Sequence, residues 1–329
     1  MDKKIYLKGM LELREKLYRY YISYEQYVKW LFRFLYSLLA FSAVAMNFGY
    51  KDTFVHPVFV VCLSLVGMFM PEGAFVLLVF LYTALQVYFL SPVLAAVILL
   101  TGVFLFSMLV RFEKQTILAM VFVPVFLWCK VPFWIPVVIG LMFTPAGVLT
   151  AASGVIMYYA LHSVKLLEKQ VHNGGMDIIT LLKNSADMIL SNKEMYSMLF
   201  TFTAIILVTY FVRLQKMSYS FEIGVGLGTA CGILVPLIGN IGFGCHFSMP
   251  FLFIGAILSG MISCLVHFGH MMLDYGATEE VQFEDEDYYY YVRAVPKLKM
   301  TVEDKRVKRI YENQKKNNKK TDRKNNKKR

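Results

Sequence analysis

The stretch that most constrains this chain is Val131–Ser163, 33 residues without a single charge. One straight helix of that length would run about 50 Å, well beyond a hydrocarbon core of about 30 Å. Thr144-Pro145-Ala146-Gly147 lies near its middle, where proline and glycine favour a break. We therefore expect two short helices that cross twice, or an element that dips into the bilayer and returns.

The composition also indicates a membrane protein. The chain is 57% hydrophobic and 17% charged, with a mean hydropathy of +0.52, whereas soluble domains are about a quarter charged. Its first 27 residues are basic and lack the short apolar core and cleavage site of a secretory signal. These features predict an all-α integral membrane protein.

The apolar runs predict a bundle of about ten transmembrane segments, some of them short or broken. Tight turns at Pro71-Glu72-Gly73 and Ser91-Pro92 join antiparallel neighbours. Thr116–Cys129 is short for a crossing, and the aromatic turn Trp128–Trp134 after it is typical of a membrane interface. With 131–163 counted twice, the other expected segments are Val28–Phe48, Phe54–Met70, Gly73–Leu90, Pro92–Val110, Thr116–Cys129, Tyr196–Val212, Tyr219–Ile238 and Phe247–Leu273.

Four regions follow from this pattern. Residues 1–27 form an expected amphipathic helix, which either lies among lipid headgroups or caps the bundle. Residues 28–273 form the bundle, and 164–195 within it form an amphipathic surface loop. There a helix is expected to lie flat on the membrane, and a capping box at Ser191 and Glu194 opens the next segment. Residues 274–300 are acidic and tyrosine-rich, and 301–329 are basic and expected to be disordered.

Small residues mark close helix contacts. Gly224, Gly228 and Gly232 are four apart in one segment, a spacing that lets helix backbones approach closely. Packing within the bundle is the interpretation we favour, and contact between two copies of the chain is the alternative.

A second irregular stretch begins at Pro236 and includes Asn240. With Thr144, Pro145 and Gly147 it places one broken element in each half of the chain, a pattern that points to the binding site of a transporter. A polar cavity lined by Thr144, Thr150, Ser153 and Asn240 would support that function. The absence of Asp or Glu from the middle of every segment argues against an ion-coupled version.

Nothing in the sequence indicates catalysis or a cofactor. The five cysteines form no Cys-x-x-Cys pair and the six histidines assemble no metal-ligand pattern. Common hydrolase and nucleotide-binding motifs are missing. We therefore expect a protein that is not an enzyme and that binds no metal or cofactor.

The segment after the bundle carries an acidic run followed by four tyrosines. Aromatic and β-branched residues ending at Pro296 favour an extended strand. The strand is expected either to dock a cytoplasmic partner or the chain's own N-terminal helix, or to be an acidic linker neutralised by the basic tail. The candidate docking residues are Glu284, Asp285, Glu286, Asp287, Tyr288, Tyr289, Tyr290 and Tyr291.

The runs VQFEDEDYYYYVRAVPK and LLKNSADMILSNKEM resemble those of uncharacterised multi-span membrane proteins from anaerobic Gram-positive bacteria, some of them described as permease-like. The resemblance extends over nearly the whole chain up to Lys297. It implies a bacterial membrane protein and supplies no catalytic residues.

The last 33 residues hold the entire net charge. Residues 297–329 contain 15 basic and 4 acidic side chains, and the remaining 296 residues balance. Such a tail favours anionic lipid headgroups over nucleic acid, because its most basic part, 315–329, lacks interleaved aromatic residues for base stacking. Two crossings in 131–163 place this tail and the N-terminus in the cytoplasm, as the positive-inside tendency requires.

Two functions are compatible with these features. The first is a permease-like component of the cytoplasmic membrane that acts with cytoplasmic partners. The second is a membrane scaffold that anchors an envelope, division or sporulation complex through the tyrosine-rich segment. A polar cavity would favour the first, and a solid core with an exposed tyrosine strand would favour the second.

Overall fold

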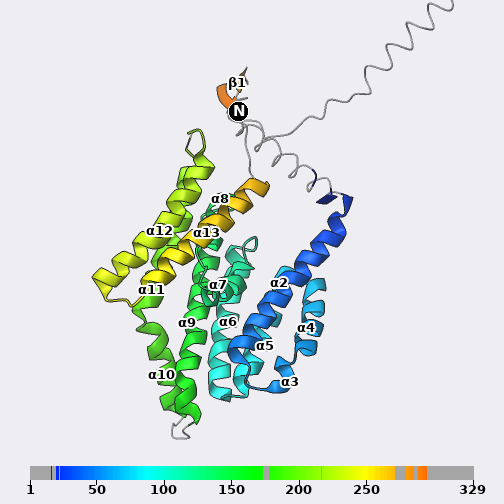
Figure 1. Cartoon of the computed structure of the whole chain (residues 1–329), viewed down its shortest axis with the longest axis vertical. Coiled ribbons are helices and arrows are strands. Elements are labelled where there is room, and N and C mark those ends of the chain that lie inside the picture. The colour runs from blue at the N-terminus through cyan, green and yellow to red at the C-terminus, as the bar shows by residue number, and fades with distance from the viewer. Residues whose placement is uncertain are drawn as a thin grey trace, which may run out of the picture.

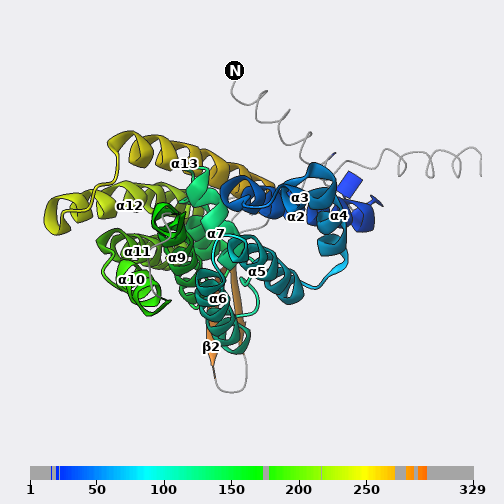
Figure 2. The ribbon, with the colours of Figure 1, turned by 90° about the horizontal axis from the view of Figure 1, so that it is seen from below.

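The structure, a computed structural model, describes residues 23–172, 178–215, 217–270, 279–284 and 288–294, together with residues 16, 20 and 21. Twelve helices, α2 to α13, and one pair of strands make up this part of the chain (Figure 1). Viewed from below, α2 to α4 lie on one side and α10 to α13 on the other, with α7 and α9 between them (Figure 2). The expected helical membrane architecture is confirmed.

The expected count of ten crossings is wrong. Among the described residues, six helices are long and apolar enough to cross a bilayer. The four-residue α3 and the nine-residue α8 are far too short, and three apolar helices fall below the length of a full crossing. The six long helices are α2 (Glu25–Phe48), α6 (Pro92–Phe112), α9 (Gly147–His172), α11 (Lys193–Arg213), α12 (Ser220–Phe243) and α13 (Met249–His270); the shorter ones are α3 (Asp52–Val55), α4 (Pro57–Phe69), α5 (Glu72–Tyr88), α7 (Ala119–Trp128) and α8 (Trp134–Met142).

The first half packs α2, α4, α5 and α6 around an aromatic core. The buried Phe41 ring meets Phe75 and Tyr82 edge-on, with ring centroids 5.9 and 5.6 Å apart. Ser37 of α2 donates a hydrogen bond of 2.7 Å to the carbonyl of Ser64 on α4. Small side chains at this contact bring the two helices together, because membrane helices gain little from apolar burial alone.

The polar end of α9 ties the two halves together. Lys165 Nζ donates to Asn47 Oδ1 at 2.7 Å, and the Tyr50 hydroxyl donates to Glu168 Oε2 at 3.2 Å. Burial, reinforced by the charge of Glu168, raises the pKa of Tyr50 above its ordinary value, so this tyrosine stays protonated at neutral pH.

In the second half, α10 (Ile178–Leu190) packs against α9 and α6 and buries Leu181 and Ser185. The predicted amphipathic helix is therefore present, and in Figure 1 it lies below α11. The predicted capping box is wrong by one residue. Asn192 caps α11, because its Oδ1 accepts the Met195 N–H at 3.1 Å.

Three glycines of α12 face α8. A Cβ atom at Gly224, Gly228 or Gly232 would lie 3.4, 3.1 or 3.0 Å from side-chain atoms of Leu141, Val137 and Phe133 respectively. Four residues of α8 and four of α12 advance each helix by about one turn, so every glycine meets the next turn of α8. The four-residue spacing of these glycines therefore allows helix packing inside the bundle, as the sequence predicted.

Of the two expected breaks, the structure contains one. Helix α8 ends at Met142 and α9 begins at Gly147, so the chain bends at Thr144-Pro145. The expected break at Pro236 is wrong, since α12 continues through it to Phe243. Asn240, rather than lining a cavity, holds the following turn: its side chain bonds both the N–H and the carbonyl of Phe247, at 3.1 and 3.0 Å.

The start of α2 and the end of α13 lie at the same end of the bundle (Figure 1). An even number of passes through a membrane would give this arrangement. The two strands, β1 (Glu279–Glu284) and β2 (Tyr289–Ala294), pair antiparallel after α13. Most of the predicted N-terminal amphipathic helix, 1–15, and the predicted disordered basic tail, 301–329, lie outside the described residues.

Substitution of Gly232 by alanine tests the α8–α12 contact. The added Cβ would lie 3.0 Å from the ring of Phe133, which is fully buried at the start of α8, so we expect the free energy of unfolding to fall by about 1–3 kcal/mol. Gly226→Ala is the matched control, because no atom lies within 4 Å of its Cβ position. Thermal midpoints of the purified protein in detergent measure both, and equal midpoints would contradict the contact.

Candidate functional site

Helices α7 and α8 form a helical hairpin that enters the bundle and returns to the same end. Near its start Thr116 contacts Thr150 of α9 at 2.8 Å, and near its turn the Trp128 ring lies 6.2 Å from that of Tyr158. Helix α7 therefore runs parallel to α9. The return along α8 brings Thr144 back to within 3.3 Å of Glu113, which precedes α7.

The lengths of the two helices show how deep this hairpin reaches. Ten residues in α7 and nine in α8 extend about 15 Å each, roughly half of a hydrocarbon core. Phe133 at the turn packs on Gly232, at the middle of α12. The sequence predicted a membrane interface for the turn Trp128–Trp134. In the structure Phe133 packs at the middle of α12, and the Trp128 ring lies 5.6 Å from that of Phe48, the last residue of α2.

The base of the hairpin holds a compact polar cluster. The carboxylate of Glu113 accepts hydrogen bonds from Thr144 Oγ1 at 3.3 Å and from the Gln115 N–H at 3.2 Å. Arg213, at the end of α11, donates to the carbonyls of Leu141 and Phe143, where α8 ends. Glu113 and Arg213 are functional candidates that the sequence interpretation missed, because nothing local shows that either faces a helix end 30 to 70 residues away.

Residues expected to line a polar cavity are instead bonded inside the bundle. Thr150 is fully buried between Thr116 and the carbonyl of Gly147. Ser153 donates to the carbonyl of Leu149 one turn before it. Such bonds satisfy hydroxyl groups locally, so they need no water-filled path.

The turn of the hairpin is fixed by α13. The N–H of Phe133 donates to Ser259 Oγ at 3.1 Å. Gly255 leaves room for the Lys130 carbonyl, which lies 2.8 Å from where a Cβ would be. Lys130 itself has a left-handed backbone, with φ of 61°, and its side chain and that of Cys129 are exposed.

The exposed charge of Lys130 is the most unusual feature of this turn. A cation on the surface of an apolar helical bundle is costly in hydrocarbon unless it reaches water, headgroups or an anion, so such residues are candidates for function. Close by, the buried indole Nε1 of Trp134 is one of three buried side-chain polar atoms without a hydrogen-bond partner in the described residues.

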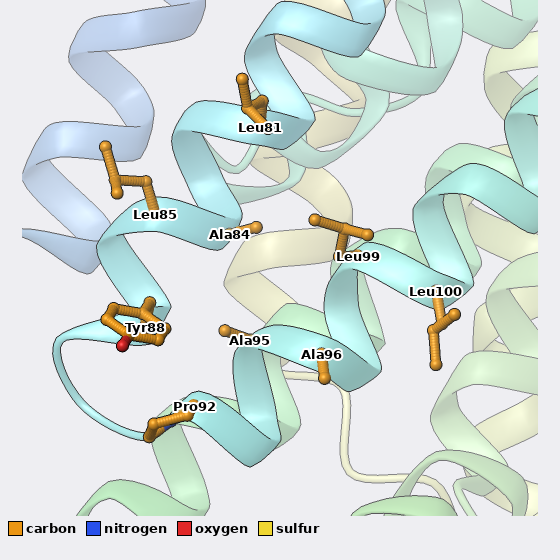
Figure 3. A pocket seen from close by; sticks show the side chains of 9 residues that line it. All are labelled: Leu81, Ala84, Leu85, Tyr88, Pro92, Ala95, Ala96, Leu99 and Leu100. Carbon is orange, nitrogen blue, oxygen red and sulfur yellow. The ribbon is translucent and has the colours of Figure 1, made fainter.

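Apolar grooves lie between α5 and α6 on the described surface. One has a volume of about 670 Å³ and is lined by leucines, alanines, one proline and Tyr88 (Figure 3). Leu81 and Leu100 at its rim are well exposed, as side chains that face lipid are. The groove offers no convergent polar groups and therefore no site for a polar substrate.

The tail strands form the second candidate surface. Glu284 pairs with Tyr289, and Val281 lies opposite Val292. The expected strand is present, and its pairing strand comes from the same chain. Tyr288 and Tyr289 are both exposed, Tyr289 to 72%. Asp285, Glu286 and Asp287 lie outside the described residues.

No group of three or more histidine, cysteine or acidic side chains in the described residues is placed to hold a metal ion. His267 of α13 lies 3.9 Å from the Glu222 carboxylate and stacks on the Phe221 ring. This contact joins the start of α12 to the end of α13 and brings no third ligand.

Substitution of Ser259 by alanine tests how the hairpin turn is held. Loss of the acceptor would leave the buried Phe133 N–H unpaired, which costs about 1–3 kcal/mol of stability. Ser107→Ala is the control, since Ser107 is exposed and bonds only to Phe104 in its own helix. Thermal midpoints in detergent should fall for the Ser259 variant alone. A fall of the same size in both variants would contradict the stabilising role of the Ser259 hydrogen bond.

No family model matches the chain, and neither a curated protein nor a solved structure matches it.

Proposed function

We propose that the protein is a membrane scaffold that anchors a protein complex through the tyrosine-rich strand pair, β1 and β2. The observation that carries this proposal is the combination of exposed tyrosines on the strand pair with a bundle in which Thr150 and Ser153, expected to line a polar cavity, are hydrogen-bonded within the protein. A scaffold needs a stable anchor and an accessible docking surface, and it needs no path for a solute.

The interior supports an anchor. Its buried hydroxyl groups mostly donate to carbonyls in their own helices, as Thr83, Thr201 and Thr209 do. The narrow space between α2, α7 and α9, beside Met120 and Met157, has a volume of about 20 Å³, about one water molecule. No polar passage lined by the expected residues runs through the described bundle.

The strand pair supports docking. Aromatic side chains with few rotatable bonds bind partners at a low entropic cost, and tyrosine is enriched at the centres of protein interfaces. Both strands are edges of a two-stranded sheet, so either one can accept a further strand from a partner. A bacterial envelope, division or sporulation complex is the class of assembly that we propose.

The orientation follows from charge. We propose that the tail and the N-terminus lie in the cytoplasm, so that the 15 basic residues of 297–329 face the anionic inner leaflet of the cytoplasmic membrane. The tail would then hold the strand pair close to the membrane surface. A second copy of the chain remains a further candidate partner.

A permease-like component is the second candidate function, and the hairpin turn favours it. A short helical hairpin that ends at the middle of the bundle with an exposed Lys130 is a feature of proteins that admit ions or solutes. The resemblance to permease-like proteins points in the same direction. For transport, water would have to reach this turn.

Substitution of Tyr289 by serine tests the scaffold. Loss of this exposed aromatic side chain should reduce capture of envelope proteins from bacterial membrane extracts at least about tenfold, while membrane insertion is unchanged. Tyr88→Ser on the lipid-facing side of α5 is the control, which should capture the parent's partners. Identical partners for all three proteins would refute docking at this tyrosine.

The reactivity of Cys129 separates the two functions. If the protein is a scaffold, Cys129 in sealed vesicles should react with a membrane-impermeant maleimide no faster than Cys264, which is exposed on α13. Each would be the single cysteine of its variant. A rate for Cys129 about tenfold above that for Cys264, from either side of the vesicle, would show water at the turn and favour a permease.

A further inference from the structure

The strand pair exposes an apolar face that the described bundle does not cover. Val281 and Val292 are directly opposite each other and each is 42% exposed. Tyr288 and Tyr290 lie on the same face as Val292, because side chains alternate along a strand, and their ring centroids are 6.3 Å apart. A two-stranded hairpin alone is at best marginally stable in water, so this face requires a cover.

A second uncovered surface belongs to the N-terminal segment. Tyr20, Tyr24 and Tyr27 follow one another at helical spacing, and all three are exposed. Their backbone is helical there, since the Tyr24 N–H donates to the Tyr20 carbonyl at 3.0 Å and the Val28 N–H to that of Tyr24 at 2.9 Å. Towards the N-terminus the sequence continues the same stripe with Leu17, Leu13 and Met10.

The charges of the two segments are complementary. Residues 1–24 contain six basic and three acidic side chains, whereas 279–294 contain six acidic side chains and one basic one. The attraction favours approach of the two segments, and their apolar residues supply the area to be buried. The basic tail also carries the opposite charge. Its residues 315–329 contain no apolar residue, but 297–314 include Leu298, Met300, Val302, Val307, Ile310 and Tyr311, so this part of the tail is the competing occupant, and adducts to it would overturn the proposal below.

The chain connections allow the contact. Helix α2 begins and α13 ends at the same end of the bundle (Figure 1). Eight residues, 271–278, separate the end of α13 from β1, and an extended chain of that length reaches at most about 28 Å. Both segments are therefore attached to the same membrane face.

We propose that the N-terminal helix of this chain, residues 5–24, covers the apolar face of the strand pair formed by Val281, Tyr288 and Val292. The result is a small layer of one helix on two strands at the membrane surface, the minimum that buries an apolar face on each element. The opposite face, which carries Tyr289, stays open. This proposal does not depend on the scaffold function.

Photo-crosslinking in reconstituted liposomes tests the contact. With p-benzoylphenylalanine at Val292, we expect adducts within residues 5–24 of the same chain, identified by mass spectrometry in the monomeric band. The same probe at Tyr289, on the other face, is the control and should give few of these adducts. The adducts from position 292 should decrease at high salt, because the opposite charges are screened.

Two variants establish whether the apolar stripe is required. Leu17→Asp and Lys16→Gln lower the charge of the N-terminal segment equally, but only the first places a charge in the stripe. We expect adducts from position 292 to fall about tenfold with Leu17→Asp and to be largely retained with Lys16→Gln.

If something other than the N-terminal helix covers this face, the crosslinked adducts will differ. Adducts from position 292 to lipid would show that the face lies on the membrane, and adducts in a dimeric band would show a second copy. Adducts to another protein would show an external partner. Each of these three results, and equal losses in the Leu17→Asp and Lys16→Gln variants, would overturn the proposal. Failure of the scaffold function would appear separately, as unchanged partner capture by the Tyr289→Ser variant.

Discussion

The close approach of α8 to α12 is the contact on which the second half of this protein depends. Helix α8 has nine residues and cannot hold a position in the membrane alone. Three glycines of α12 accept successive turns of α8, and Ser259 of α13 accepts the N–H at its start. Arg213 bonds the carbonyls at its end. The backbone groups at both ends of this short helix are therefore hydrogen-bonded by side chains of other helices. In a soluble protein, water would form these hydrogen bonds.

The same requirement explains why the interior is polar in places and yet closed. In a hydrocarbon environment an unpaired backbone or hydroxyl group costs several kcal/mol, so each must find a partner within the protein. At the base of the helical hairpin, Glu113, Thr116, Thr144 and Thr150 form such bonds with one another or with nearby backbone. These hydrogen bonds explain why the four polar residues are present, so no channel is needed to explain them. Three buried polar atoms without a hydrogen-bond partner in the described residues, among them Trp134 Nε1, do not follow this rule. The exposed Lys130 lies close to Trp134 and supports the alternative function.

The strand pair follows a different principle, because it lies after the last helix and carries an acidic and aromatic sequence. Its stability cannot come from the two strands alone, whose apolar residues remain exposed in the described structure. A cover on one face and a partner on the other would use both sides of the pair. The two proposals for this segment therefore assign different faces and can be tested independently.

The sequence by itself determined the membrane class, the break at Thr144-Pro145, the amphipathic helix α10 and the extended tyrosine segment. Each depends on composition, on periodicity or on the local backbone preference of proline. Only the tertiary structure decided that the run from Ala119 to Met142 returns instead of crossing, and that Pro236 leaves α12 unbroken. The reason is physical: the fate of a short apolar helix depends on which distant groups satisfy its ends, and Ser259 lies 126 residues from Phe133.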